Sequence, residues 1–132
     1  MFKQLFNNVF DRKNGKLGFK PDFVNGTLNH KPITEIEAGK CKLNFENQAF
    51  KISQNDKFLT DKMENVCSIR TWIFKGKLYL IIETKQHNNY MFSFPDVEIN
   101  DLTIGILLKP LETYAKEFEI PFEYQGESKD ND

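Results

Sequence analysis

The residues best suited to chemistry in this 132-residue chain are two histidines, two cysteines and two pairs of carboxylates. His30 and His87 belong to no HExxH pattern, and we expect each to be an ordinary turn residue. Cys41 and Cys67 form no CxxC motif and have no histidine close by in sequence. This arrangement predicts reduced thiols that are buried in the core, with no metal site and no disulfide framework.

The carboxylate pairs are weak candidates for catalysis. Glu35 and Glu37 would share one face of a strand, and Asp61 and Glu64 one helical turn, but such spacings are mostly found on solvated surfaces. The serines and glycines form no GxSxG, GxGxxG or Walker pattern. The sequence therefore predicts no catalytic residue, no metal ligand and no cofactor, and a protein that is not an enzyme.

Charge and hydropathy limit the class of partner. The net charge is -1 and the isoelectric point about 6.1, so nucleic acid is not the expected partner, because counterion release favours basic proteins. The mean hydropathy is -0.54, and the chain shows neither a run of about 20 apolar residues nor the apolar region of a signal peptide. We expect a cytoplasmic protein. Frequent lysine and asparagine with little arginine are typical of an AT-rich bacterial or phage genome.

A β-hairpin centred on Lys75-Gly76 organises the chain. Two runs rich in β-branched and aromatic residues flank this dipeptide, and glycine permits the positive φ that a two-residue turn requires. Alternation then predicts an apolar inner face: Ile69, Thr71, Ile73, Leu78, Leu80 and Ile82, with Cys67 opposite Thr84. A three-residue loop near His87 and Asn88 would add a third strand to this core through Tyr90, Phe92 and Phe94.

The outer face of the same hairpin is unusually apolar. The register places Trp72 opposite Tyr79 and Arg70 opposite Ile81. A solvated sheet face rarely carries this mixture, whereas the centre of a protein interface often does. We therefore predict that Trp72, Tyr79, Ile81 and Arg70 bind another protein, whose identity stays open, as does a homo-oligomer.

An amphipathic helix is predicted over residues 2–10. Its apolar residues recur at helical spacing, namely Phe2, Leu5, Phe6, Val9 and Phe10. Two interpretations remain open: the helix packs on the domain and covers the outer face of the hairpin, or it lies on a membrane or a partner. Its polar face offers only Lys3 as a cation, whereas membrane-surface helices are usually rich in lysine and arginine.

Weaker signals organise the rest of the chain. In the first half we predict a linker over 11–21, a small hairpin turning at Asn25-Gly26 and a bulge or bend at Gly39-Lys40. A further hairpin is predicted to turn at Glu46-Asn47, which places Leu43 opposite Phe50 and Cys41 opposite Ile52. We predict a long loop or a single helical turn over 54–65. In the second half we predict a helix capped by Asn100 or Asp101, kinked or restarted at Pro110, then a strand through Ile120, Phe122 and Tyr124 and a frayed acidic tail over 126–132. The predicted helix has an apolar stripe: Ile104, Leu107, Leu108, Leu111, Tyr114, Ala115 and Phe118.

The predicted fold is mainly β with helices: a small antiparallel barrel or orthogonal sandwich of six or seven strands with a C-terminal helix. The order AGKCKLNFENQAFKI, SIRTWIFKGKLYLIIETK and the ILLKPLETYAKEF helix resembles that of pleckstrin-homology-like domains over residues 22–118, within a single domain expected over 22–125. The resemblance implies a non-enzymatic binding or scaffolding module. The alternative is a peripheral membrane protein anchored by the N-terminal helix, although only Lys31, Lys40 and Lys42 stand where the lipid-binding members have a basic cluster.

Overall fold

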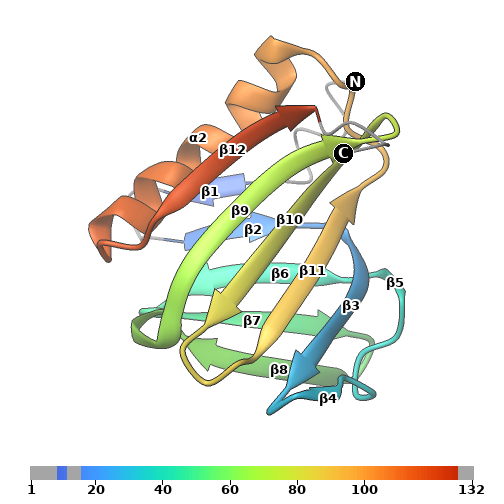
Figure 1. Ribbon diagram of the computed structural model, residues 1–132, viewed down its shortest axis with the longest axis vertical. Helices are drawn as coiled ribbons and strands as arrows, with labels where there is room; N and C mark the ends of the chain where they lie inside the picture. The colour runs from blue at the N-terminus through green and yellow to red at the C-terminus, as the bar shows by residue number, and fades with distance from the viewer. Residues whose placement is uncertain (1–8, 12–15, 128–132) are drawn as a thin grey trace.

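Two β-sheets and a long helix form the computed structural model, which describes residues 9–11 and 16–127. The five-stranded sheet has the order β1 (Val9–Asp11), β2 (Lys16–Phe19), β6 (Lys42–Glu46), β7 (Ala49–Gln54) and β8 (Lys57–Lys62). The seven-stranded sheet has the order β12 (Phe122–Glu127), β9 (Val66–Phe74), β10 (Lys77–Thr84), β11 (Asn89–Phe94), β3 (Asp22–Leu28) and β4 (Lys31–Pro32), with β5 (Gly39–Lys40) also paired to β3. The strands of the two sheets cross steeply, as Figure 1 shows.

The fold class is confirmed in its broad terms and wrong in its details. The protein is mainly β with a C-terminal helix, as predicted. Of the two predicted architectures, the barrel is wrong because the two sheets do not close, and the sheets contain more than six or seven strands. The last strand, β12, pairs in parallel with β9, whereas the prediction had only antiparallel strands.

The central hairpin has the predicted register. Its turn residues, Lys75 and Gly76, have positive φ values of 50° and 77°, which suit the right-handed twist of the flanking strands. Ile73 lies opposite Leu78, and the other inner pairs follow. The next loop is also as predicted, because the Thr84 amide donates to the Asn88 carbonyl at 2.9 Å across three residues. Tyr90, Phe92 and Phe94 are accordingly buried in the core.

A β-bulge overturns one prediction on this hairpin. The register shifts between Glu83 and Thr84, so that Thr84 pairs with Val66 and not with Cys67. The extra residue turns outward, and Cys67 is exposed although the sequence placed it in the core. Cys41 is buried as predicted.

The other hairpins show where local turn signals succeed or fail. The β6–β7 hairpin forms, but its turn is Asn47-Gln48, with φ values of 56° and 62°, and not Glu46-Asn47. Phe45 therefore lies opposite Phe50, and Leu43 lies opposite Ile52. The predicted pairs, Leu43 with Phe50 and Cys41 with Ile52, do not form. Because the pairing slips by two residues, the same side chains still face the core.

The predicted hairpin at Asn25-Gly26 is wrong, because these residues continue one strand, β3. Gly26 is needed there for a different reason: a Cβ atom at this position would lie 2.3 Å from the carbonyl oxygen of Asn89 on β11. The chain turns instead at Asn29 and His30, both with positive φ. The bend predicted at Gly39 is confirmed, since β5 pairs with β3 while β6 joins the other sheet.

The segments predicted to lack strands contribute two strands to the five-stranded sheet. Residues 54–65 contain β8 and the single helical turn η1 (Met63–Asn65), so the long loop is wrong and the helical turn is confirmed. The expected linker over 11–21 contains β2, whose Leu17 and Phe19 are buried. These short strands carry too few alternating positions to show a clear period in the sequence.

The N-terminal helix prediction falls mostly outside the described residues. Its last two residues, Val9 and Phe10, belong to β1, which pairs with β2, so that a helix over the whole of 2–10 is wrong at its C-terminal end. Phe2, Leu5 and Phe6 lie outside the described residues.

The C-terminal helix, α2 (Asp101–Glu117), begins and faces as predicted. Asn100 is its N-cap, and the side-chain oxygen accepts a hydrogen bond from the Thr103 amide at 2.8 Å. The predicted apolar stripe is buried apart from half-buried Phe118, and the helix continues through Pro110 without a new segment. The final strand is confirmed as β12, which extends through Gly126 and Glu127, two residues assigned to the tail.

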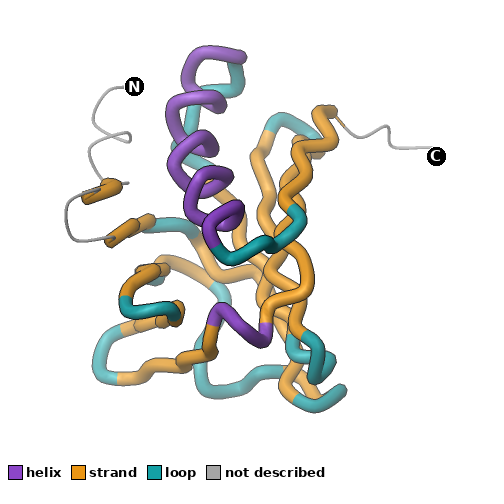
Figure 2. The backbone as a smooth tube through the Cα atoms, turned by 90° about the vertical axis from the view of Figure 1, so that its left-hand side faces the viewer, coloured by secondary structure: helices purple, strands orange, loops and turns teal. Residues whose placement is uncertain are grey.

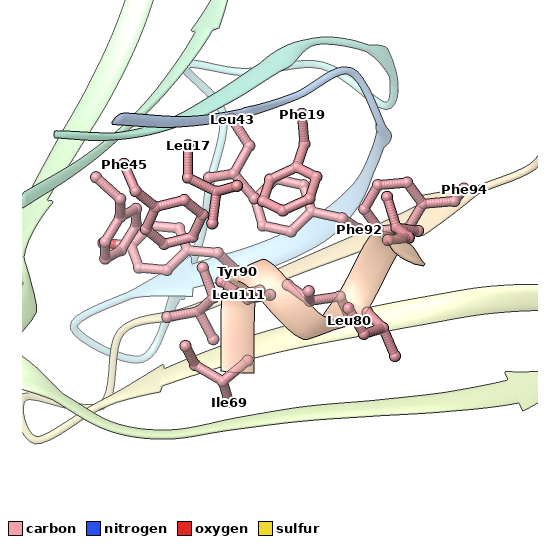
Figure 3. Packing of buried hydrophobic residues seen from close by; sticks show 14 of the residues in the cluster. Leu17, Phe19, Leu43, Phe45, Ile69, Leu80, Tyr90, Phe92, Phe94 and Leu111 are labelled. Atoms are coloured by element: carbon pink, nitrogen blue, oxygen red, sulfur yellow. The ribbon is translucent and has the colours of Figure 1, made fainter. Parts of the chain in front are cut away.

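The core lies between the seven-stranded sheet on one side and the five-stranded sheet with α2 on the other. Figure 2 shows α2 at the end of the molecule away from β8, and Figure 3 shows side chains from both sheets and from α2 meeting in one cluster. Phe45 illustrates the packing, because its ring lies 5.9 Å from Phe50 on the next strand and 5.6 Å from Tyr114 on α2. One face of each sheet is therefore covered, and the opposite faces are left outward.

Candidate binding surface

The predicted surface residues all lie on the outward face of β9 and β10. Trp72 pairs with Tyr79 and Arg70 with Ile81, as the sequence indicated, and all four side chains are half-buried. The alternation that buries Thr71 and Leu80 completely turns these neighbours outward.

The centre of this surface is a pair of stacked rings. The ring centroids of Trp72 and Tyr79 are 5.6 Å apart and their planes differ by 12°. Each ring restricts the rotamers of the other, because both are attached to directly opposed positions on adjacent strands. The pair is thus ordered before any partner arrives.

An ion pair orders the neighbouring cation. One carboxylate oxygen of Glu83, Oε1, accepts from Arg70 Nη2 at 2.8 Å, from Arg70 Nε at 3.0 Å and from the Ser68 hydroxyl at 3.0 Å. Such a partly exposed pair contributes little to stability. It does hold the guanidinium group of Arg70 in one position on the outward face.

Two further apolar residues extend the surface, and the sequence analysis did not name them. Met91 on β11 lies opposite Ile81, and Phe74 follows Trp72 on the same face; both are half-buried. The alternation of the predicted strands would have identified them. We call the surface formed by these side chains the aromatic face: Arg70, Trp72, Phe74, Tyr79, Ile81 and Met91.

None of the described elements covers the aromatic face. The five-stranded sheet and α2 both pack on the inner side of β9, β10 and β11, and these strands lie in the foreground of Figure 1. β1, the first described element, lies at the edge of the five-stranded sheet, which is the opposite layer. The covering of the aromatic face by the N-terminal segment stays a prediction, because residues 1–8 lie outside the described residues.

The residues considered for chemistry occupy structural positions. His30 and His87 lie in two neighbouring turns with their rings stacked at 4.6 Å, which confirms that they are turn residues. Burial, followed by the charge of Asp22, raises the pKa of the Cys41 thiol to about 12, so the nucleophilic thiolate is disfavoured. No group of three or more metal-ligating side chains occurs within residues 9–11 and 16–127.

The carboxylate pairs are also accounted for. Asp61 Oδ2 accepts from the hydroxyl of Tyr90 at 3.0 Å, and burial together with this charge raises the pKa of the Tyr90 phenol. Glu64 lies 3.8 Å from Lys62, a solvent-exposed pair. Glu35 accepts from the neighbouring Thr34 amide, and Glu37 is exposed. Asp61 is thus committed to the core tyrosine, and the other carboxylates lie at the surface.

Two further results complete the description. Within the part of the chain that the structure describes, no helix has the length and apolar content that a bilayer crossing requires. Comparison with protein-family models and with curated proteins finds no match to this chain.

Proposed function

We propose that this protein is a non-enzymatic binding module whose partner is another protein and whose contact surface is the aromatic face. The observation that carries the proposal is the stacked pair of Trp72 and Tyr79 on a sheet face that no described element covers. Tryptophan, tyrosine and arginine are the residue types that most often dominate binding energy at protein interfaces. Because the two rings and Arg70 are already ordered, these side chains would lose little conformational entropy when a partner binds.

The proposed architecture remains the pleckstrin-homology-like one. The meander of β9, β10 and β11 followed by α2 supports it, while the parallel strand β12 departs from it. The proposed function does not depend on this likeness, because it is argued from the residues of the aromatic face.

The proposal can be tested by quantitative capture of partners from the native host with matched variants. Trp72→Ala should reduce recovery of the partner by about thirtyfold, which corresponds to a hot-spot loss of about 2 kcal/mol. Tyr124→Ala is the control, because Tyr124 is an aromatic residue exposed on a different surface, at 42%. Equal recovery with wild type, Trp72→Ala and Tyr124→Ala would contradict the proposal.

A photo-crosslinking amino acid at position 79 separates the kinds of partner. A crosslinked product of twice the 15.5 kDa chain mass would identify a second copy, and a heavier product of different composition another protein. Recovery of the protein with membranes, without a crosslinked protein, would favour the peripheral membrane alternative and contradict the proposal.

The covering of the aromatic face by the N-terminal segment can be tested separately. Trp72 is the one tryptophan of the chain, so its fluorescence reports on this face alone. If residues 1–8 do not cover it, their deletion should leave the emission maximum and the quenching by acrylamide unchanged. A red shift with stronger quenching would show that the segment was the cover.

A further inference from the structure

A second outward surface lies on the five-stranded sheet and is positively charged although the chain as a whole is not. Alternation turns one lysine outward on each of four adjacent strands: Lys16 on β2, Lys42 on β6, Lys51 on β7 and Lys62 on β8. All four side chains are exposed. We call these four residues the lysine face. The outward positions of the same strands carry a single carboxylate, Glu46.

The compensating negative charge lies elsewhere in the sequence and in space. Residues 101–127, which form α2 and β12, contain six acidic and two basic side chains: Asp101, Glu112, Glu117, Glu119, Glu123 and Glu127 against Lys109 and Lys116. The net charge of -1 thus combines an acidic C-terminal segment with an excess of lysine on the outward face of the five-stranded sheet. The low net charge of the whole chain therefore does not oppose the binding of anionic ligands at the lysine face.

The lysines are only weakly engaged. Lys16 lies 3.2 Å from Glu46 and Lys62 lies 3.8 Å from Glu64, both as exposed pairs. Pairs of this kind are worth little and exchange readily with other anions. The positive charge of the face is therefore accessible to a ligand.

The centre of the lysine face is hollowed. A recess of about 610 Å³ is lined by two of the lysines, Lys16 and Lys51, by the carboxylate of Glu46, and by small or short polar residues that include Gly18, Asn44 and Thr60. A recess suits a narrow chain that lies within it, whereas a flat bilayer would contact the lysine tips alone.

An exposed aromatic ring adjoins the recess. Phe58 on β8 is 58% exposed, and the Nζ atom of Lys51 lies 4.6 Å from the centre of its ring. A cationic groove combined with an aromatic ring is the arrangement on which single-stranded nucleic acids bind, since phosphates meet the cations and a base stacks on the ring. An acidic peptide would use the charges without requiring the ring.

We propose that the lysine face binds single-stranded nucleic acid without strong base preference. None of the four outward cations is arginine, so the bidentate phosphate and guanine contacts that arginine provides are not part of this surface. Binding then rests on charge and on stacking, and is salt-dependent. This site is separate from the aromatic face and does not require it.

The test is fluorescence anisotropy of labelled oligouridine and oligothymidine against salt concentration. If four lysines neutralise four phosphates, the slope of log K against log salt is about -2.8, which is a loss of about fiftyfold in affinity between 50 and 200 mM salt. The double variant Lys42→Gln/Lys51→Gln should halve this slope and weaken binding at low salt by at least tenfold. Phe58→Ala should weaken binding about fivefold or more, with little change in slope.

The matched control removes the same charge from a different element, α2. The double variant Lys109→Gln/Lys116→Gln removes two positive charges, as Lys42→Gln/Lys51→Gln does, but both of its positions lie on α2. It should leave the affinity for the oligonucleotide and the salt slope unchanged. Circular dichroism of each variant confirms that the fold is retained.

Three outcomes would overturn the proposal. They are no anisotropy change at low salt, binding that both double variants reduce equally, and equal binding of a polyglutamate peptide. If the protein sediments with phosphatidylserine vesicles and does not bind the oligonucleotides, the lysine face binds a membrane surface, and the proposal is likewise overturned.

Discussion

The outward faces of the two sheets follow the same alternation but carry opposite kinds of side chain. On β9 and β10 the residues that point away from the core are Trp72, Tyr79 and Ile81, whereas on β6 and β7 they are Lys42, Asn44 and Lys51. The inner positions of these four strands are mostly buried and apolar, with Thr71 and Thr84 as buried polar exceptions. Inner residues are therefore restricted by the shared core, while outer residues are free to differ and to specify what each surface contacts.

The two faces also differ in how firmly their side chains are held. The rings of Trp72 and Tyr79 stack on each other, and Arg70 is fixed by Glu83. The lysines make longer, exposed contacts. An ordered apolar surface suits a partner of defined shape, and a mobile cationic one suits a ligand that varies in sequence.

The largest effect is expected from the core that both faces share. Phe45→Ala removes a fully buried ring that contacts Phe19, Phe50 and Tyr114, and should lower the free energy of unfolding by about 3–5 kcal/mol. Urea denaturation followed by circular dichroism measures the loss. A cost under about 1 kcal/mol would contradict the close packing of this ring in the core.

An intermediate effect should distinguish the faces by stability alone. Trp72→Ala should lower the free energy of unfolding by about 1–2 kcal/mol, because it removes a half-buried ring and the stacking of that ring on Tyr79. Phe58→Ala should change stability by no more than about 0.5 kcal/mol, because Phe58 is largely exposed. The same urea denaturation compares them. Equal costs would contradict the view that one surface is ordered by the fold and the other is not.

The smallest effect on stability is expected at Cys67, which lies at the β-bulge of the central hairpin. In the native protein Cys67 should react with a thiol reagent, and Cys41 only after unfolding. Cys67→Ser should change stability by no more than about 0.5 kcal/mol. Protection of Cys67 in the native protein would contradict the bulge that turns it outward.

The pKa of Cys41 adds a pH dependence with a definite sign. The thiol pKa is about 12 in the folded chain against 9.0 in the reference state, so the unfolded chain loses its proton first as pH rises. Stability from this group is present below pH 9 and falls as pH rises from 9 toward 12. Between pH 9 and 12 the free energy of unfolding should therefore fall less steeply with pH in Cys41→Ser than in the wild type. An unchanged dependence on pH would contradict this account.

Local signals predicted the parts of the fold in which pattern and turn chemistry agree. Lys75-Gly76 between two alternating runs predicted the central register, and Asn100 before an apolar stripe predicted the start of α2. Local signals failed where a distant contact decides. Asn25-Gly26 has the composition of a turn, yet Gly26 is required by the close approach of Asn89, which is 63 positions along the chain. Four of the six residues of the aromatic face were predicted, while the lysine face was not, because its strands include two that the sequence did not reveal.

The sequence by itself determined which side chains of β9 and β10 face inward, since that property depends only on alternation and on a turn between neighbouring residues. It also determined the helix and its buried stripe, for the same local reason. The tertiary structure alone decided that β1, β2 and β8 complete a second sheet, that Cys67 turns outward at a bulge, and that four lysines from separate strands meet on one surface. Each of these depends on pairing between segments whose own patterns are too short to specify a partner, so burial in the common core selects the arrangement.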